Sequence, residues 1–413
     1  MDPAADVRAW LDANWDPDLS LVEWRNRLAD SGWGCPTWPR EWLGRGLPAS
    51  MESAVTAAFD AAGAVGMPQG SGIGLAAPTI LEHGSDDLKS RLLRPIVTGE
   101  HTWCQLFSEP GSGSDLAGLT TRAERDGDEF VINGQKVWNT SAHHARYGML
   151  LARTDWDVAK HRGITYFAID MHQPGIEVRG LRQMNGHASF NEVFFDDARV
   201  PAADAIGNVG NGWAVALATL AHERRFNAGP RVRTAADAGG ARRAGRALTE
   251  AAAETAEHYE PYKWYPQRAG RVDLVIERAQ TTGRAADPRV RQDIVRLMTL
   301  HRTAQWTTQR AKAERALGRP PGPEGSLAKL ASSHIARAAA DVHGAIAGAH
   351  GMLSGSDDGT GGVVAEVLVS VPAVSIAGGT DEIQRNIIGE RVLALPKEPQ
   401  VDRDLPFREV RRN

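Results

Sequence analysis

The chain has 413 residues, a length that corresponds to two or three domains of ordinary size. Hydrophobic residues make up 42% and charged residues 24%, which excludes a disordered or fibrous protein. With 47 basic and 51 acidic residues the net charge is −4, which excludes a globally basic nucleic-acid-binding protein.

The two cysteines, Cys35 and Cys104, are too few for a disulfide framework, so we expect a reducing, cytoplasmic location. The N-terminal residues lack the basic and apolar regions of a secretory signal peptide. Uncharged stretches are too short to cross a bilayer, and we therefore expect no membrane span.

The predicted elements change character twice along the chain. Residues 1–99 are expected to be mostly helical, because Leu19–Leu28 has helical spacing and Ala54–Val65 is rich in alanine. Residues 100–208 contain short apolar runs separated by Gly, Asp and Pro, which predict a small all-β domain. Residues 209–413 return to the helical period. We therefore expect an α+β protein that is mainly α.

Individual elements follow from the same patterns. The run Phe130–Trp138 follows Asp126–Asp128, a hairpin signal with a central glycine. Further strands are expected at Gly148–Ala152, Ile164–Ile169, Ile176–Arg179 and Val193–Phe195. Helices are expected at Trp213–Phe226, Ala338–Ala349 and Asp381–Leu393, and through the apolar face of Val290, Ile294, Leu297 and Met298. The proline-rich Gly318–Glu324 is expected to be a turn.

Tryptophans are concentrated near the N-terminus, at Trp10, Trp15, Trp24, Trp33, Trp38 and Trp42. We expect them to pack a helical layer, and an aromatic platform for a ligand is the alternative.

Two candidate sites lie in the predicted β region. Phe107–Asp115, of sequence FSEPGSGSD, is a glycine-rich turn whose amides and hydroxyls can hold phosphates or an anionic ring edge. It matches neither the P-loop nor the dinucleotide fingerprint, so a plain turn is the alternative. Trp138–Ser141 places an indole beside hydroxyls, which suits a flat conjugated ligand. A tryptophan buried in a β core is the alternative there.

Two more candidates lie in the helical region. Glu223 follows an apolar helical run, and burial raises the pKa of a carboxylate toward that of a general base. Its alternative is an ion pair with a neighbouring arginine on a solvated face. Ala377–Glu382, of sequence AGGTDE, predicts a helix N-terminus that binds an anion or is simply a capped turn. The histidines lack metal-ligand spacing, so we expect no metal and a surface position for His143 and His144.

In this order, these runs resemble the acyl-CoA dehydrogenase family of flavoenzymes over nearly the whole chain. The similar segments are Trp38–Gly46, Leu106–Asp115, Phe130–Thr140 and Gly379–Arg391. The resemblance implies an N-terminal helical domain at 1–99, a β-barrel-like domain at 100–208 and a C-terminal four-helix bundle at 209–413. It also implies FAD as cofactor, an acyl-CoA substrate and an electron-transferring flavoprotein as electron acceptor.

The resemblance assigns roles only to positions that match the family's motifs. The implied cofactor-binding residues are Phe107 and Ser108 at the pyrimidine edge of the flavin, Trp138 and Thr140 beside the isoalloxazine, and Thr380 and Glu382 near the phosphates and ribose. The implied substrate-side residues are Ser114, Arg224 and Gly378, the last through its amide.

The base has two alternative positions in the family. Medium-chain members carry the glutamate directly before the Gly-Thr of the last signature, where this chain has Gly378. Isovaleryl- and long-chain-type members carry it on a helix in a Glu-Arg pair, which Glu223–Arg224 matches. Glu223 is therefore the implied base for removal of the proton α to the thioester, with hydride passing from Cβ to flavin N5 to give a trans-2-enoyl-CoA. Glu382 is the fallback.

Two segments depart from the family's pattern. Ala279–Gly283 lacks an Arg and a Phe, and Ala345–Ala349 lacks a Gln-x-x-Gly-Gly run. In the family these residues reach a neighbouring subunit's FAD, so we expect either a homotetramer or an α2β2 heterotetramer. A flavin oxidase and a non-catalytic subunit are the alternative functions. The acyl chain is left open, although a base on the helix favours branched, long or bulky chains.

Overall fold

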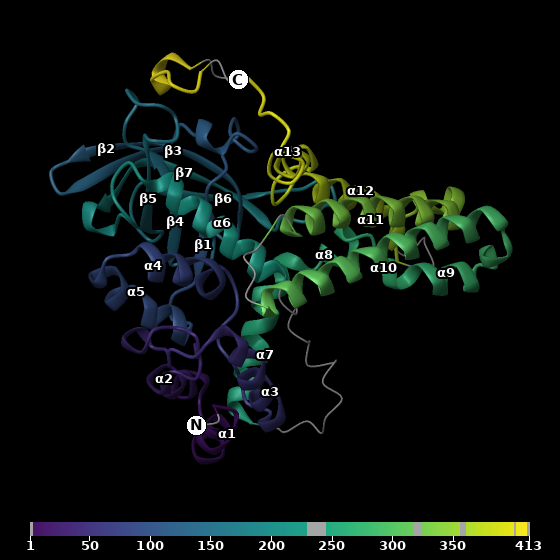
Figure 1. The fold of residues 1–413 in the computed structure, drawn as a ribbon, viewed down its shortest axis with the longest axis horizontal. Coiled ribbons are helices and arrows are strands. Elements are labelled where there is room, and N and C mark those ends of the chain that lie inside the picture. Colours follow the sequence, from purple (N-terminus) through teal and green to yellow (C-terminus); the bar gives the residue numbers. More distant parts are fainter. Residues whose placement is uncertain are drawn as a thin grey trace. The chain divides into compact units, whose positions relative to one another are not determined.

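The computed structural model describes residues 3–228, 245–317, 322, 324–355, 361–399 and 402–410. The chain divides into two compact units (Figure 1). The first comprises Met1–Leu181, Ala188–Pro261 and Val401–Asn413, and the second Arg182–His187 and Tyr262–Gln400. The turn expected at Gly318–Glu324 lies largely outside the described residues.

The first unit begins with helices, as predicted. Its helices are α1 (Pro3–Asn14), α2 (Leu21–Ser31), α3 (Glu52–Ala62), α4 (Ala77–His83), α5 (Asp86–Thr98), α6 (Gly212–Ala228) and α7 (Arg246–Tyr259). Local sequence sets their ends: Ser20 and Glu23 form a capping box at the start of α2, and Gly32 ends that helix at φ 72°. Ser85 caps α5 by accepting a hydrogen bond from the Leu88 amide.

The N-terminal tryptophans pack against these helices. Trp24 is fully buried and lies 5.5 Å from Trp10 and 4.6 Å from Trp15, measured between ring centroids. Trp33 belongs to the same apolar cluster, whereas Trp38 packs against the neighbouring one. The expected helical packing layer is therefore confirmed.

The β region forms a single sheet of seven strands. The strands are β1 (Trp103–Leu106), β2 (Arg122–Asp126), β3 (Glu129–Thr140), β4 (Tyr147–Arg153), β5 (Ile164–Asp170), β6 (Ile176–Leu181) and β7 (Phe190–Pro201). Their order is β1-β4-β2-β3-β7-β6, with β5 paired to β4. Gly127, at φ 65°, makes the tight turn between β2 and β3, so the predicted hairpin is confirmed.

Helix α6 is fixed to both the sheet and the N-terminal helices. The hydroxyl of Thr219 lies 2.9 Å from that of Thr79 on α4 and 3.2 Å from the phenol of Tyr166 on β5. All three side chains are buried. The surrounding core combines α4 and α5 with the inner face of the sheet and Val215 of α6.

The C-terminal residues return to the first unit. Phe407 is buried, and the Arg153 guanidinium lies 3.4 Å from the centroid of its ring. The Phe407 amide donates a hydrogen bond of 2.9 Å to the Val158 carbonyl. Residues 402–410 are thus anchored on the loop between β4 and β5.

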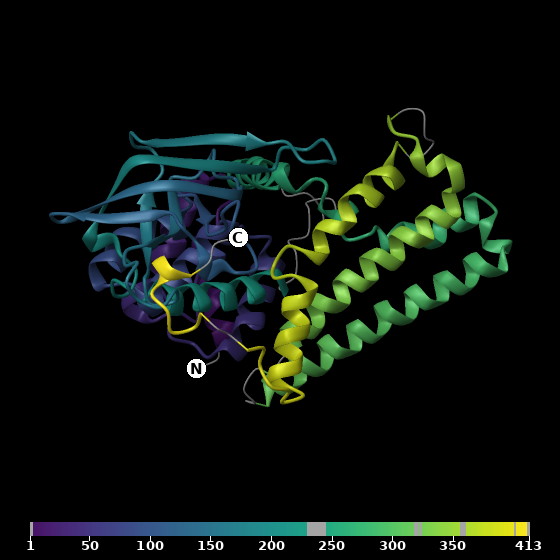
Figure 2. The ribbon, with the colours of Figure 1, turned by 90° about the horizontal axis from the view of Figure 1, so that it is seen from above.

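The second unit is helical. It contains α8 (Tyr265–Arg268), α9 (Val275–Thr281), α10 (Pro288–Ala316), α11 (Glu324–Ala347), α12 (Val363–Ser370) and α13 (Asp381–Arg391). The long helices α10 and α11 run side by side (Figure 2) and bury Val290 and Leu297. Met298, which we expected on this buried face, is instead half-buried and borders an open surface hollow.

The mainly helical α+β class is confirmed, while the domain boundaries near residues 100 and 209 remain predictions. None of the described helices combines the length and the apolar character needed to cross a membrane.

Leu92 tests the core that joins α5 to the sheet, because it is 1% exposed in the cluster that contains Phe107. Leu92→Ala should lower the free energy of unfolding by about 2–5 kcal/mol, since the truncation leaves a cavity. Val22→Ala on α2, where Val22 is 66% exposed, is the control and should change it by less than about 0.5 kcal/mol. Equal losses in denaturant titrations of the two variants would contradict this placement of Leu92.

Candidate functional site

The glycine-rich run starts directly after β1. Phe107 is buried, and its ring packs edge-on against Tyr166 at 5.7 Å, so only its backbone is available to a ligand. Ser108 is half-buried, and within the described residues neither its amide nor its hydroxyl has a hydrogen-bond partner. Both donors are available to a ligand, although Glu109 and Ser112 close a turn within the run through reciprocal backbone hydrogen bonds of 3.1 and 3.0 Å.

Trp138 has an unusual backbone geometry for a residue in a sheet. The β3–β7 register shifts between Lys136 and Asn139, and within this bulge Trp138 adopts φ 65°. A left-handed backbone costs a residue other than glycine roughly 1–2 kcal/mol. The side chain is nevertheless 56% exposed, so the alternative of a tryptophan buried in the β core is wrong. Strain of this kind is concentrated at functional sites.

Hydrogen bonds hold the two β-region motifs side by side. The Val137 amide donates to the Ser108 carbonyl at 2.9 Å, and the Asn139 side chain donates to the Gln105 carbonyl at 2.7 Å. Thr140, the next residue, is half-buried, and its hydroxyl has no partner in the part of the chain that the structure describes. The structure therefore brings an exposed indole together with the unpaired hydroxyls of Ser108 and Thr140.

Ser114 lies farther along the glycine-rich run, on an exposed segment. Its neighbour Asp115 pairs with Lys160 at 3.0 Å, which ties the segment to the β4–β5 loop. A Cβ added at Gly111 or Gly113 would meet no atom within 4 Å, so open space surrounds the run here. A ligand can approach this backbone closely.

Glu223 lies near the C-terminal end of α6 and is half-buried. It follows Thr219 by one helical turn and therefore projects from the face that packs on the sheet. His222 is hydrogen-bonded to Glu82 on α4 at 3.2 Å, which fixes this part of the helix. Glu223 is therefore not fully solvated, and the alternative of an ion pair with a neighbouring arginine stays a prediction. The side chain of Arg224 lies outside those that the structure describes.

In the second unit, Ala377–Glu382 forms the turn before α13. Thr380 caps the helix by accepting a hydrogen bond from the Ile383 amide at 3.2 Å, which confirms the predicted capped N-terminus. Gly378 and Gly379 have φ values of 69° and 85°, and a Cβ added at Gly378 would meet no atom within 4 Å. Glu382 is exposed and pairs with Arg385 at 3.2 Å.

A buried carboxylate that the sequence analysis missed supports this turn. Asp381 accepts hydrogen bonds from Lys329 at 3.2 Å and Arg337 at 3.0 Å, both on α11. Burial alone would raise the pKa of Asp381, but hydrogen bonds from Ser333 and Lys329 hold it below its usual value. These bonds fasten the start of α13 to α11.

The two segments that depart from the family's pattern pack into the helical core. Ala279 is buried, and Ala345 packs against the same cluster. The preceding Arg278 is also buried and donates to Nδ1 of His343 at 2.8 Å. Arg284, which the sequence analysis did not single out, donates to the Ala345 carbonyl at 3.2 Å from an exposed position.

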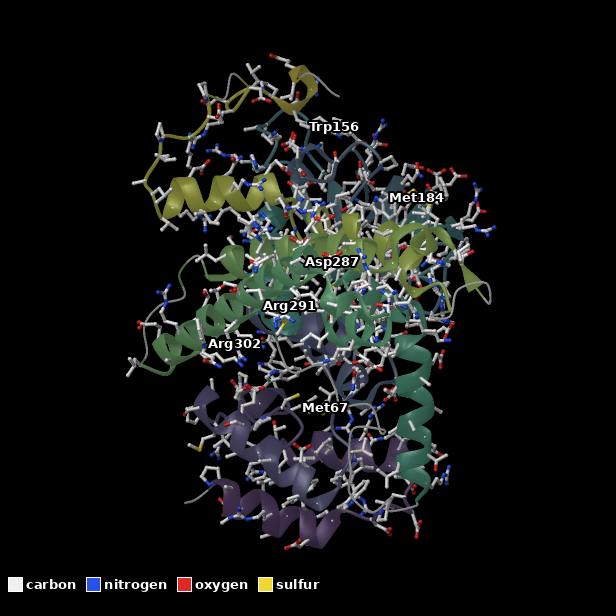
Figure 3. All side chains as sticks on the ribbon, turned by 90° about the vertical axis from the view of Figure 1, so that its right-hand side faces the viewer. Met67, Trp156, Met184, Asp287, Arg291 and Arg302 are labelled. Atoms are coloured by element: carbon white, nitrogen blue, oxygen red, sulfur yellow. The ribbon has the colours of Figure 1, made fainter. Side chains whose placement is uncertain are left out.

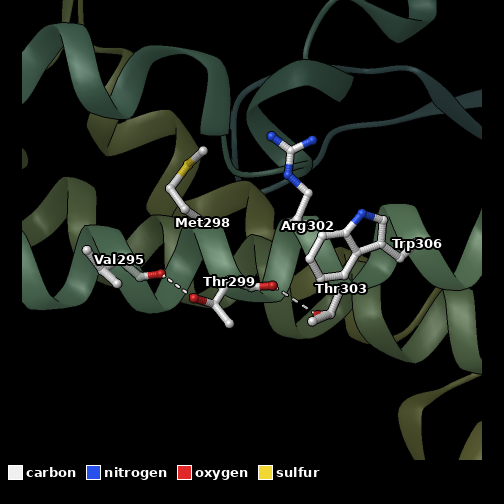
Figure 4. Close-up of a pocket in the computed structure, with 6 residues that line it drawn as sticks. All are labelled: Val295, Met298, Thr299, Arg302, Thr303 and Trp306. Carbon is white, nitrogen blue, oxygen red and sulfur yellow. Dashed lines mark hydrogen bonds between the residues drawn. The ribbon is translucent and has the colours of Figure 1, made fainter.

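The surface of α10 carries a shallow hollow of about 290 Å³, in which no predicted site residue takes part. Its lining residues are Val295, Met298, Thr299, Arg302, Thr303 and Trp306 (Figure 4). Arg291 and Arg302 are exposed on the same helix (Figure 3).

Among the described residues, no cluster of three or more His, Cys, Asp or Glu side chains is arranged to bind a metal. His143 and His144 are both exposed, as predicted.

Models of three domains of one protein family match consecutive parts of the chain. They are the N-terminal domain of acyl-CoA dehydrogenase at residues 4–100, the middle domain at 104–198 and the C-terminal domain at 268–393.

Individual proteins and solved structures are also similar to this chain. The chain is 35% identical to acyl-CoA dehydrogenase IpdE1 of Mycobacterium tuberculosis, over 95% of this chain and 97% of that protein. It is 31% identical to (2S)-methylsuccinyl-CoA dehydrogenase of Cereibacter sphaeroides, over 91% and 64%. Among solved structures, the ChsE4–ChsE5 complex of Mycobacterium tuberculosis matches with a TM-score of 0.66, 25% identity, and coverage of 96% and 97%.

Trp138 separates a ligand-binding role from a structural one. Trp138→Gly removes the backbone strain, so the ligand-free protein should gain up to about 1 kcal/mol of stability. Binding of FAD, the cofactor that the family resemblance implies, should weaken about tenfold because the aromatic surface is lost. Calorimetric unfolding and FAD titration measure the two effects. Ala394→Gly, at an exposed residue with φ 53°, is the control and should leave FAD binding unchanged. Unaltered FAD affinity in Trp138→Gly would argue against a site at this indole.

Proposed function

Because the chain belongs to the acyl-CoA dehydrogenase family, we propose that it catalyses the FAD-dependent α,β-dehydrogenation of an acyl-CoA thioester to a trans-2-enoyl-CoA. The family makes it a flavoprotein oxidoreductase that acts on acyl-CoA. The observation that carries the proposal is the exposed, strained Trp138 beside the unpaired hydroxyls of Ser108 and Thr140.

These residues fit the flavin ring of FAD. The indole of Trp138 offers an aromatic face, and the Ser108 amide and hydroxyl offer hydrogen bonds to a polar ring edge. We assign the backbone of Phe107 to the polar edge of the ring, and the Thr140 hydroxyl would donate a hydrogen bond near N5. We assign Thr380 and Glu382 to the phosphate and ribose end, where the capped N-terminus of α13 also favours an anion. Bound FAD supplies the hydride acceptor.

We assign proton removal to the Glu223 carboxylate. It is half-buried, which suits a base better than full exposure, and its helix is held by Thr219 and His222. Gly378, the alternative family position, has no side chain. Its exposed amide and the open space around it suit a hydrogen bond to the thioester oxygen instead. Such a bond stabilises the enolate that develops as the α-proton leaves.

Ser114 and Arg224 are the proposed contacts to the acyl-CoA. The exposed, open backbone around Ser114 supports its part in this proposal. The position of the base on α6 favours a branched, long or bulky acyl chain. An electron-transferring flavoprotein is the proposed electron acceptor.

The experiment that tests the activity is anaerobic mixing of FAD-loaded protein with straight, branched, aromatic and steroid side-chain acyl-CoAs. The visible flavin absorption should be lost with at least one of them. Hydrogen peroxide formed when the same mixture stands in air would favour the oxidase alternative. A protein that takes up no FAD, alone or with a homologous partner chain, would contradict the proposal.

Glu223→Gln removes the proton acceptor at nearly constant size. The rate of flavin reduction by substrate should fall about 10²–10⁴-fold, while FAD binding and stability stay unchanged. Stopped-flow absorbance measures the rate. Glu124→Gln is the control, because Glu124 is an exposed carboxylate on β2 that pairs with Arg122 and not with α6. A wild-type rate in Glu223→Gln would redirect the assignment to Glu382.

We propose that the chain assembles as a homotetramer or as an α2β2 heterotetramer, and that the apolar stripe on α10 contributes to the interface. Trp306 is 59% exposed and Val295 is 58% exposed, and both line the surface hollow on α10 (Figure 4). Trp306→Glu should shift the native mass toward smaller species, because a charged side chain opposes burial of this stripe. Arg289→Glu, an exposed residue off the stripe, is the control. Light scattering, alone and with a homologous partner chain, measures the mass; unchanged assembly in Trp306→Glu would exclude this surface.

A further inference from the structure

A buried ion pair lies directly beneath the proposed flavin site. Lys136 of β3 is 0% exposed, and its Nζ lies 2.8 Å from the Glu109 carboxylate, which is also buried. The same carboxylate accepts hydrogen bonds from the Thr120 amide and hydroxyl, at 2.7 and 2.9 Å, and from the Thr121 amide at 2.8 Å. The glutamate is thus fully engaged, and the glycine-rich run is fixed at its third residue.

Stability alone does not account for this pair. Removing two charges from water costs more than their attraction usually returns, and well-packed apolar replacements of a buried pair are often as stable. The pair also makes a contact with the main chain: Lys136 Nζ donates a hydrogen bond to the Phe107 carbonyl at 3.0 Å. One ammonium therefore holds both the carboxylate and the first peptide of the run.

The geometry of the Phe107–Ser108 peptide links this buried contact to the direction of the Ser108 N–H. The Phe107–Ser108 peptide is trans, so its carbonyl and its N–H point in opposite directions. Because the carbonyl is directed at the buried Lys136, the Ser108 N–H is directed away from the buried pair. The Ser108 carbonyl is fixed separately by the Val137 amide at 2.9 Å. The Ser108 N–H is left without a partner among the described residues, beside the exposed Trp138.

We propose that the Lys136–Glu109 pair is a positioning device that holds the Ser108 amide as a hydrogen-bond donor to the flavin ring. The inference rests on the proposed function, and it adds two residues that do not touch the cofactor. The Glu109 carboxylate remains ionised at neutral pH. Burial by itself would raise the pKa of Glu109, but Lys136 and the neighbouring donors lower it to about 2. Burial lowers the pKa of Lys136, and Glu109 opposes that shift.

The test uses the full-length double variant Lys136→Met/Glu109→Gln, which removes both charges at similar volume. Its unfolding temperature without FAD should stay within about 4 °C of wild type. Its FAD dissociation constant should rise at least tenfold. An amide donor stabilises reduced flavin more than oxidised flavin, so a tenfold relative loss should lower the two-electron midpoint potential by about 30 mV.

The matched control is Arg199→Met/Glu129→Gln, an exposed ion pair between β7 and β3, which should change neither the FAD dissociation constant nor the midpoint potential. A purely structural role for the buried pair would lower stability and leave the potential of the FAD that still binds unchanged. FAD affinity and potential like those of wild type in the buried double variant would overturn the inference.

A measurement on the wild type covers the case in which the variant does not fold. The Ser108 amide should exchange its hydrogen rapidly without FAD and at least tenfold more slowly with it, which residue-resolved mass spectrometry can follow. Unchanged exchange at Ser108 in protein that binds FAD would overturn the positioning role and leave the proposed function intact. Wild type that binds no FAD would overturn both.

Discussion

The buried side chain of Tyr166 lies where the sheet, the N-terminal helices and α6 meet. Its ring packs against Phe107 at the start of the glycine-rich run, and its phenol lies 3.2 Å from the Thr219 hydroxyl on α6. Thr219 in turn contacts Thr79 on α4. Tyr166 therefore contacts both the backbone proposed to face the flavin and the helix that carries Glu223. Their relative position depends on packing around this phenol rather than on either loop.

Local sequence was sufficient to predict most helices and strands. The hairpin at Gly127 and the cap at Thr380 depend on residues close together in the chain, and both are present in the structure. Periodicity was less reliable where a helix is apolar on two sides. Met298 fits the spacing of the buried face of α10, yet it borders the open hollow, because spacing alone does not tell which face a neighbour covers.

The sequence was sufficient to predict which segments form the candidate site, but not how their side chains are arranged in space. The exposure of Trp138 arises from a bulge that changes the register between Lys136 and Asn139, and no strand pattern reveals an extra residue of this kind. The Lys136–Glu109 pair joins β3 to the segment after β1, between residues 27 positions apart in the chain. Charged side chains are ordinarily solvated, so a buried pair formed by tertiary packing has no local signature.

The path of the chain has a practical consequence. It passes between the two units four times, because residues 182–187 belong to the second unit and residues from Val401 onward rejoin the first, where Phe407 is buried. Neither unit is therefore one uninterrupted stretch of sequence. A fragment that stops after the β region or after α7 omits the C-terminal piece that covers Arg153, and it leaves that cation and its apolar surroundings open to solvent. Truncation is a useful way to dissect proteins whose domains are consecutive stretches of sequence. In this chain, truncation before residue 402 would remove residues that complete the first unit.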